Sequence, residues 1–238
     1  MADITDTAGE QQDDQAVRSV WLRPRREVRG NQPLTRARIV DAAIELLDEE
    51  GVDRLTMRRL ADRLRAGAPS LYWHVDTKDD VIDLAVDAIF GEAPPQRAAA
   101  ADWRTEVTGV LTSWRAALLR HPWAAGLPAR QRPTIGPNFL ATMETLQAAL
   151  ARAGFDGHRL SSATWVLYNH VMGSASSEST LKISTDERRL GQQRLQAERD
   201  RYPTLADNGY LFDDDFEGSY RTGLRYLLDG LEAQLGQQ

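Results

Sequence analysis

The sequence lacks cysteine, long apolar runs and the apolar N-terminal segment of a signal peptide. Its 238 residues include no cysteine, which excludes disulfides, thiolate metal sites and cysteine nucleophiles and fits a reducing cytoplasm. No apolar run approaches the length of a membrane span, and the first residues contain no signal-peptide core. We therefore expect a soluble, cytoplasmic protein with no membrane partner.

The motifs of common enzyme classes are also missing. The chain contains no GxSxG, GxGxxG, phosphate-binding loop or HExxH. Acidic residues at 79–80 and 213–215 are better explained as helix starts, where the helix dipole favours negative charge. Four histidines are present without metal-ligand spacing, at His74, His121, His158 and His170. We expect no catalytic residue, no metal and no cofactor.

Alternating strand patterns of useful length are absent, whereas apolar residues recur at helical spacing along most of the chain. The predicted fold class is therefore all-α. Proline and glycine predict loops at 121–138 and 201–212. The expected helices span about 35–50, 56–64, 68–74, 77–91, 102–120, 140–154, 158–182, 184–200 and 214–234.

The net charge of −6 taken alone argues against a nucleic-acid partner, but the charge is unevenly distributed. Residues 1–17 are acidic, polar and aperiodic, which predicts disorder. Residues 18–33 carry five arginines against one glutamate and predict a flexible or extended arm. One interpretation is a solvated tail that only improves solubility. The other is an arm that enters a DNA minor groove through Arg23, Arg25 and Arg26.

Two short helices joined by a tight turn are predicted between residues 56 and 74. Thr56 can cap the first helix, and Leu55 and Leu60 occupy the positions of a hydrophobic staple. A break follows at 65–67, and Pro69 stands where a first-turn proline belongs. This pattern is typical of a helix-turn-helix.

Arginine is concentrated in the same stretch. Five arginines face only two aspartates between residues 53 and 65, a local excess of three positive charges. Phosphate is the natural counterpart of such a surface. The alternative is an ordinary buried helical hairpin with a solvated, arginine-rich face.

This stretch resembles the TetR family of bacterial transcriptional regulators, in which LTxRxLAxxL, a turn and PxLYWHVxxK occur in this order. The matching residues are Leu55, Thr56, Arg58, Leu60, Ala61, Leu64, Pro69, Leu71, Tyr72, Trp73, His74, Val75 and Lys78. The resemblance implies a three-to-four-helix head over residues 33–91. Its recognition helix, residues 68–74, would lie in the major groove.

The resemblance also implies a role for individual residues of the head. Side chains expected to approach base edges are Arg58, Ala68, Pro69 and Ser70. Side chains expected to hold phosphates and set the register are Tyr72 and Lys78. Thr56, at the start of the preceding helix, is included among the DNA-contacting residues.

Four further positions of the head receive other interpretations. Leu71 and Trp73 are expected to pack the head, while His74 is either a phosphate partner or a structural residue. Arg65 stands where the family usually places glycine. Either the turn is rearranged, or Arg65 is retained for an extra phosphate contact.

The rest of the chain resembles, more loosely, the C-terminal domain of the tetracycline-repressor branch of the family. The segments WRAALLRHPW and RPTIGPN precede a helical pair, in this order. The resemblance implies three parts: the segment 1–32, the head, and a domain over residues 92–238 that binds a ligand and dimerises. The helices expected to form the dimer contact lie at about 158–180 and 214–234. We expect a homodimer on a palindromic double-stranded operator, released by a small-molecule effector.

A bulky apolar or aromatic effector is suggested by large side chains with few polar groups among them. Pro94 replaces a histidine of the tetracycline-binding members, which argues against a tetracycline–magnesium effector. Asn169 and His170 are the polar candidates, and for each aromatic residue the alternative is simple core packing. The candidates are Trp103, Trp114, Trp123, Phe139, Met143, Trp165, Tyr168, Asn169, His170 and Met172.

Two other classes of function remain as alternatives. One is an architectural DNA-binding protein without an effector, which the size of the C-terminal domain disfavours. The other is an all-α enzyme, which the missing motifs disfavour more strongly.

Overall fold

The computed structural model describes residues 20–21, 34–92, 102–127, 135–209 and 214–236, and within these ranges it contains helices and no strand. The all-α prediction is confirmed. The head contains α1 (Arg36–Glu50), the 3₁₀ helix η1 (Val52–Arg54), α2 (Met57–Leu64), α3 (Ala68–Leu71) and α4 (Lys78–Gly91). The body contains α5 (Trp103–Arg120), α6 (Pro122–Ala125), α7 (Pro137–Ala153), α8 (Gly157–Thr180), α9 (Thr185–Ala197), α10 (Pro203–Asn208) and α11 (Phe216–Leu235).

Local capping interactions begin the helices of the head. The side chains of Thr35 and Thr56 accept hydrogen bonds from backbone N–H groups in the first turns of α1 and α2. Thr77 and Asp80 form a capping box at the start of α4. These interactions are encoded within four residues of sequence, which is why the predicted starts agree with the observed ones.

Arg65 ends α2 in a left-handed conformation, with φ 50° and ψ 40°. It is the only non-glycine residue with positive φ in the described part of the chain. The turn is therefore not rearranged around a different residue; Arg65 itself adopts the backbone conformation that glycine takes most easily.

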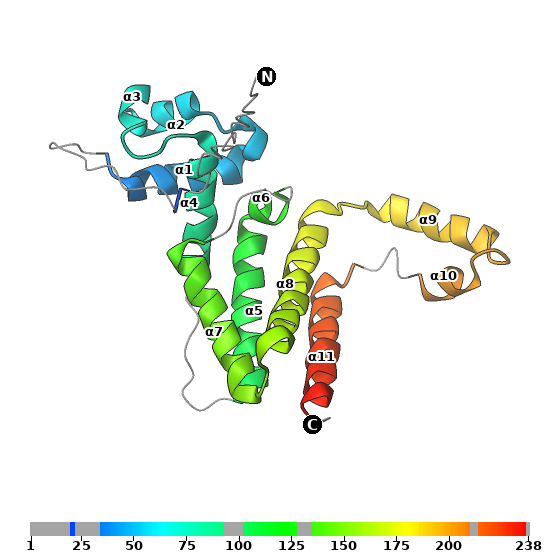
Figure 1. Ribbon diagram of the computed structural model, residues 1–238. Helices are drawn as coiled ribbons and strands as arrows, with labels where there is room; N and C mark the ends of the chain where they lie inside the picture. Colours follow the sequence, from blue (N-terminus) through cyan, green and yellow to red (C-terminus); the bar gives the residue numbers. More distant parts are fainter. Residues whose placement is uncertain (1–19, 22–33, 93–101, 128–134, 210–213, 237–238) are drawn as a thin grey trace, which may run out of the picture.

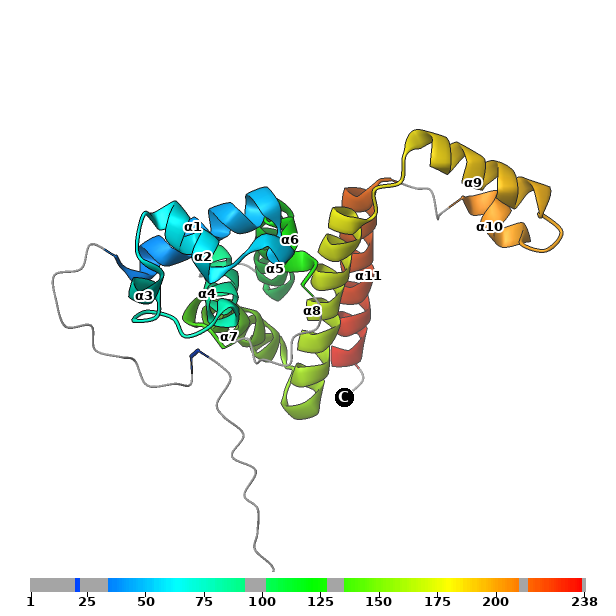
Figure 2. The same cartoon turned by 90° about the horizontal axis from the view of Figure 1, so that it is seen from above.

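The body is organised around α5, which packs against α6, α7 and α8. Helices α8 and α11 lie side by side and antiparallel, and α9 with α10 projects away from them (Figures 1 and 2). Two predicted loops were wrong in part, because each contains a short helix, α6 or α10. Both helices have proline in the first turn, so the residues that predicted a loop instead begin a helix.

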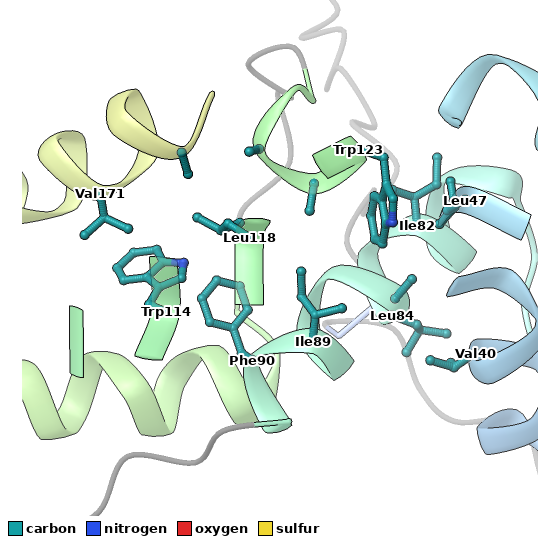
Figure 3. Packing of buried hydrophobic residues seen from close by; sticks show 14 of the residues in the cluster. Val40, Leu47, Ile82, Leu84, Ile89, Phe90, Trp114, Leu118, Trp123 and Val171 are labelled. Atoms are coloured by element: carbon teal, nitrogen blue, oxygen red, sulfur yellow. The ribbon is translucent and has the colours of Figure 1, made fainter. Parts of the chain in front are cut away.

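One apolar core runs without interruption from the head into the body (Figure 3). Val40 and Leu47 of α1, Ile82 and Ile89 of α4, and Leu118 of α5 are all buried members of it. Helix α4 belongs to both parts, because it contacts α1 in the head and α5 and α7 in the body.

Buried polar contacts join the head to the body beside this core. Asp87 of α4 accepts hydrogen bonds from the backbone N–H of Phe139, at 2.9 Å, and from the side-chain amide of Asn138, at 3.1 Å. The carboxylate thus caps the N-terminus of α7. Burial raises the pKa of Asp87, and the hydrogen bonds from Phe139 and Asn138 oppose that rise. Gly136 is required there, since a Cβ on it would lie 2.1 Å from Asp87 Oδ1.

A second contact lies between α1 and the end of α5. The imidazole of His121 is buried, with Nδ1 2.8 Å from Asp48 Oδ1 and Nε2 2.8 Å from Glu92 Oε1. Trp123 Nε1 donates to the same Asp48 oxygen at 2.7 Å. The head is therefore attached to the body on two sides, through α4 and through α1.

We predict that Arg65→Gly raises the free energy of unfolding by roughly 0.5–1 kcal/mol, because glycine relieves the left-handed strain but loses more entropy on folding. The measurement is urea unfolding followed by circular dichroism. Arg65→Ala serves as the control, because alanine keeps the strain. An equal gain for both variants would contradict a backbone origin.

Candidate DNA-binding surface and ligand site

Helices α2 and α3 form the helix-turn-helix, with α3 shorter than predicted. The α-helix ends at Leu71, and a turn continues to His74, where the backbone N–H groups of His74 and Val75 both donate to the Leu71 carbonyl. Leu71 is fully buried, Pro69 is exposed, and Ser70 is half-buried. Three of the predicted base-contacting residues, Ala68, Pro69 and Ser70, therefore lie at the start of α3, and the fourth, Arg58, is exposed on α2.

Trp73 does not pack the head, contrary to prediction. Its side chain is 56% exposed, whereas Leu71 and Val75 are buried. Leu71 and Val75 are four residues apart and lie on the same side of a helical turn. Trp73, halfway between them, therefore lies on the opposite side and points outward. Tyr72 is 44% exposed, and Trp73 therefore joins Tyr72 on the accessible surface beside α3.

The predicted excess of positive charge is partly neutralised by α1. Arg59 pairs with Glu50, and Arg63 pairs with Glu49 and Glu45. The predicted count considered only the charges close in sequence, and it missed these carboxylates because they come from a different helix. The arginines of this stretch that are exposed and have no ion-pair partner among the described residues are Arg54, Arg58 and Arg65.

The side chain of Lys78 and the backbone of His74 make hydrogen bonds within the head. Lys78 Nζ donates to the carbonyl of Val52 at 2.7 Å and so fastens η1 to the start of α4. Arg36 donates to the carbonyl of His74 at 3.1 Å. Burial, followed by the nearby Arg36 guanidinium, lowers the pKa of His74. A neutral imidazole is a weak phosphate partner, which favours the structural interpretation of His74.

The N-terminal arginines Arg23, Arg25 and Arg26 lie outside the described residues, so their minor-groove role stays a prediction. Val20 and Trp21, from the predicted arm, are described. Val20 is buried, Trp21 is half-buried, and both belong to the apolar core. The arm was therefore predicted incorrectly at these two residues, which pack against folded protein.

An aromatic cluster lies where α4, α5, α7 and α8 meet. Trp114 contacts Phe90 and Tyr168, with ring centroids 5.3 Å apart in each pair, and Phe139 at 6.2 Å. Phe90 also contacts Phe139 at 5.3 Å. We use the term aromatic cluster for Phe90, Trp114, Phe139, Tyr168 and Trp165, the last of which packs on Tyr168 and is 61% exposed.

Phe90 was not among the predicted ligand residues. It follows Ile82 and Val86 at four-residue spacing, a periodicity that continues to the end of α4 and was available in the sequence. Met143 and Met172 are half-buried against the core, one helical turn beyond Phe139 and Tyr168. These two predicted ligand residues therefore lie next to the aromatic cluster, further along α7 and α8.

Four other predicted ligand residues lie elsewhere. Trp103 packs on Phe155 near the start of α5, at 6.1 Å, and Trp123 bonds Asp48 at the head–body contact. The remaining two are the predicted polar residues of the site, Asn169 and His170.

Asn169 is exposed, and His170 faces α11. His170 Nε2 donates to the Tyr220 carbonyl at 3.0 Å, and the two rings stack. Neither residue is among the side chains of the aromatic cluster, so their role in a ligand site stays a prediction.

The cluster has little charge of its own. Burial raises the pKa of Tyr168, so its phenol is neutral at physiological pH. Arg115, next to Trp114 in sequence, is directed to the α8–α11 side, where it bonds Ser174, Glu178 and Glu217. No group of three or more potential metal ligands occurs among the described residues. No described helix is long and apolar enough to cross a bilayer.

Comparison with known proteins gives two family matches. Residues 39–85 match the model described as bacterial regulatory proteins, tetR family, and residues 95–235 match the tetracyclin repressor-like C-terminal domain. Together these matches include the helix-turn-helix and helices α5, α7 and α8 of the aromatic cluster, whereas Phe90 at the end of α4 lies between the two matched ranges.

Individual relatives are similar over most of the chain. An HTH-type transcriptional regulator of Saccharopolyspora erythraea is 44% identical over 92% of this chain and 93% of its own length. The HTH-type transcriptional repressor DrrR1 of Streptomyces coeruleorubidus is 31% identical over 100% of this chain and 92% of its own. The crystal structure of the Streptomyces coelicolor TetR family protein ActR with actinorhodin has a TM-score of 0.76 and 28% identity, covering 87% of this chain and 99% of that one.

We predict that Arg58→Ala reduces discrimination between a DNA site selected from a random pool and unselected DNA by roughly 1–3 kcal/mol, because an unpaired, exposed arginine is free to bond a base. Fluorescence anisotropy at fixed salt measures both affinities. Arg63→Ala on the same helix is the control and is expected to change discrimination little, since Arg63 is already paired. Equal losses on both DNAs for Arg58→Ala would refute base contact.

Proposed function

Since this chain belongs to the TetR family of bacterial transcriptional regulators, and is thus a ligand-responsive DNA-binding repressor, we propose that two copies bind one palindromic operator as a homodimer. A single head presents a short α3 and few unpaired arginines, which is little surface for specific binding. Two heads held at a fixed spacing double the contacts and match the symmetry of the site.

The proposed dimer contact is the side of the α8–α11 pair that faces away from α5. On α8, Val166, Asn169 and Gly173 are exposed at helical spacing, and on α11 the same holds for Tyr226 and Gly230. Val166 is 42% exposed and Tyr226 is 66% exposed, which is high for large apolar side chains. An uncharged face with two glycines allows the helices of a second copy to approach closely, and burial of the exposed apolar area drives association.

One observation carries the proposal that ligand binding releases DNA: helix α4 extends from the recognition region to the aromatic cluster. Its first residue, Lys78, fastens η1, and Phe90 at its other end contacts Trp114 and Phe139. A ligand that enters the cluster has to displace or reorient Phe90. That displacement moves α4 and changes the spacing of the two heads, so the ligand favours the state that cannot span the operator.

The cluster favours an uncharged, aromatic effector. Stacking and edge contacts with aromatic rings stabilise planar ligands, whereas burying a charge without a partner costs several kcal/mol or more. The complex of the similar protein ActR with actinorhodin supports a small-molecule effector. The effector is proposed to bind between α4, α5, α7 and α8 of each subunit.

We predict that Gly230→Arg converts the dimer into monomers, because it places a charge in the proposed contact. A Cβ at Gly230 has no neighbour within 4 Å, so the single chain accommodates the substitution. Light scattering coupled to size exclusion measures the mass, and the weakened operator affinity is measured on the same sample.

Gly109→Arg is the matched control. Gly109 is also helical, exposed and free of neighbours within 4 Å of an added Cβ, but it lies on α5. This variant is expected to keep the wild-type mass and operator affinity. A Gly230→Arg protein that stays dimeric would refute the proposed contact.

A further inference from the structure

We propose that the indole N–H of Trp114 is the specificity-determining donor of the ligand site, and that it selects aromatic compounds carrying a neutral carbonyl oxygen. The inference rests on the proposed function, because it takes the aromatic cluster to be the ligand site. It adds the identity of the polar group that the ligand must present.

The indole N–H of Trp114 is a buried hydrogen-bond donor without an acceptor. The side chain is 3% exposed, and Nε1 is buried without a hydrogen-bond partner among the described residues. Trp123 shows the usual arrangement, since its Nε1 donates to Asp48 at 2.7 Å. Leaving a buried donor unsatisfied is costly, so such a group is uncommon and calls for an explanation.

The direction of this donor agrees with a ligand role. Nε1 lies on the side of the Trp114 ring that faces Phe90 and Leu118 (Figure 3). The apolar side chains there offer no acceptor, and Phe90 is the residue through which α4 enters the cluster. A ligand oxygen that reaches Nε1 therefore also contacts the helix that carries the signal to the head.

The acceptor has to be brought by the ligand, and it has to be uncharged. Arg115 is already bonded to Ser174, Glu178 and Glu217 and lies over the Tyr220 ring, at 4.5 Å, so it is not available to neutralise an anion at the cluster. The phenol of Tyr168 is neutral at physiological pH, and burial raises its pKa further, so it supplies no charge either. A ketone or quinone oxygen on a planar ring system fits these conditions, whereas a carboxylate or phosphate does not.

The test compares two probes that share a carbon frame. 9-Fluorenone has one carbonyl oxygen, and fluorene has none. Equilibrium dialysis against the full-length protein gives both dissociation constants. We expect the wild type to bind fluorenone roughly tenfold more tightly than fluorene, the value of one buried hydrogen bond of about 1.4 kcal/mol.

Trp114→Phe keeps an aromatic ring and removes the donor, so it is expected to bind the two probes with similar affinity. Trp103→Phe, the same change outside the cluster, is expected to keep the preference. Thermal unfolding of each variant, followed by circular dichroism, verifies that the change lies in binding and not in folding.

The inference is overturned if the wild type binds neither probe, if it shows no preference for fluorenone, or if the preference persists in Trp114→Phe. Operator binding without any probe, measured on the same proteins, separates this failure from that of the proposed function. A dimer that binds its operator but shows no preference refutes the donor role alone.

Discussion

The buried contact between Asp87 and the N-terminus of α7 is the constraint on which the arrangement of head and body depends. A carboxylate that accepts two or more hydrogen bonds inside the protein has little freedom to move, because any displacement leaves buried N–H groups without an acceptor. Gly136 gives the carboxylate its room, and the apolar core on either side excludes water. Helix α4 is consequently fixed to α7 less than one turn before Phe90, its residue in the aromatic cluster.

Much of the fold could be predicted because the interactions that begin and end its helices are local in sequence. Thr35, Thr56 and Thr77 cap helices through neighbours three residues away, and Gly51 and Gly154 end helices through positive φ values. Short helices α6 and α10 were missed, because a proline that begins a helix and a proline that interrupts one look alike without the surrounding packing.

The binding surfaces were predicted less completely, for reasons of packing between distant segments. The pairing of Arg59 and Arg63 with α1 depends on how two helices cross, which a count of nearby charges does not include. His170 and Asn169 were recognised as polar residues in an apolar helix, but the side of α8 on which they lie follows from where α5 and α11 pack. By contrast, the outward position of Trp73 was available from the spacing of Leu71 and Val75.

The continuous core has a consequence for how the protein folds. Because Ile82, Ile89 and Phe90 of one helix are buried against both parts of the molecule, neither part completes its own core alone. A fragment cut after Gly91 would expose Phe90 and leave Asp48 without His121 and Trp123. Head and body are therefore expected to unfold as one cooperative unit, because the helix through which we propose that ligand and DNA are coupled belongs to both cores.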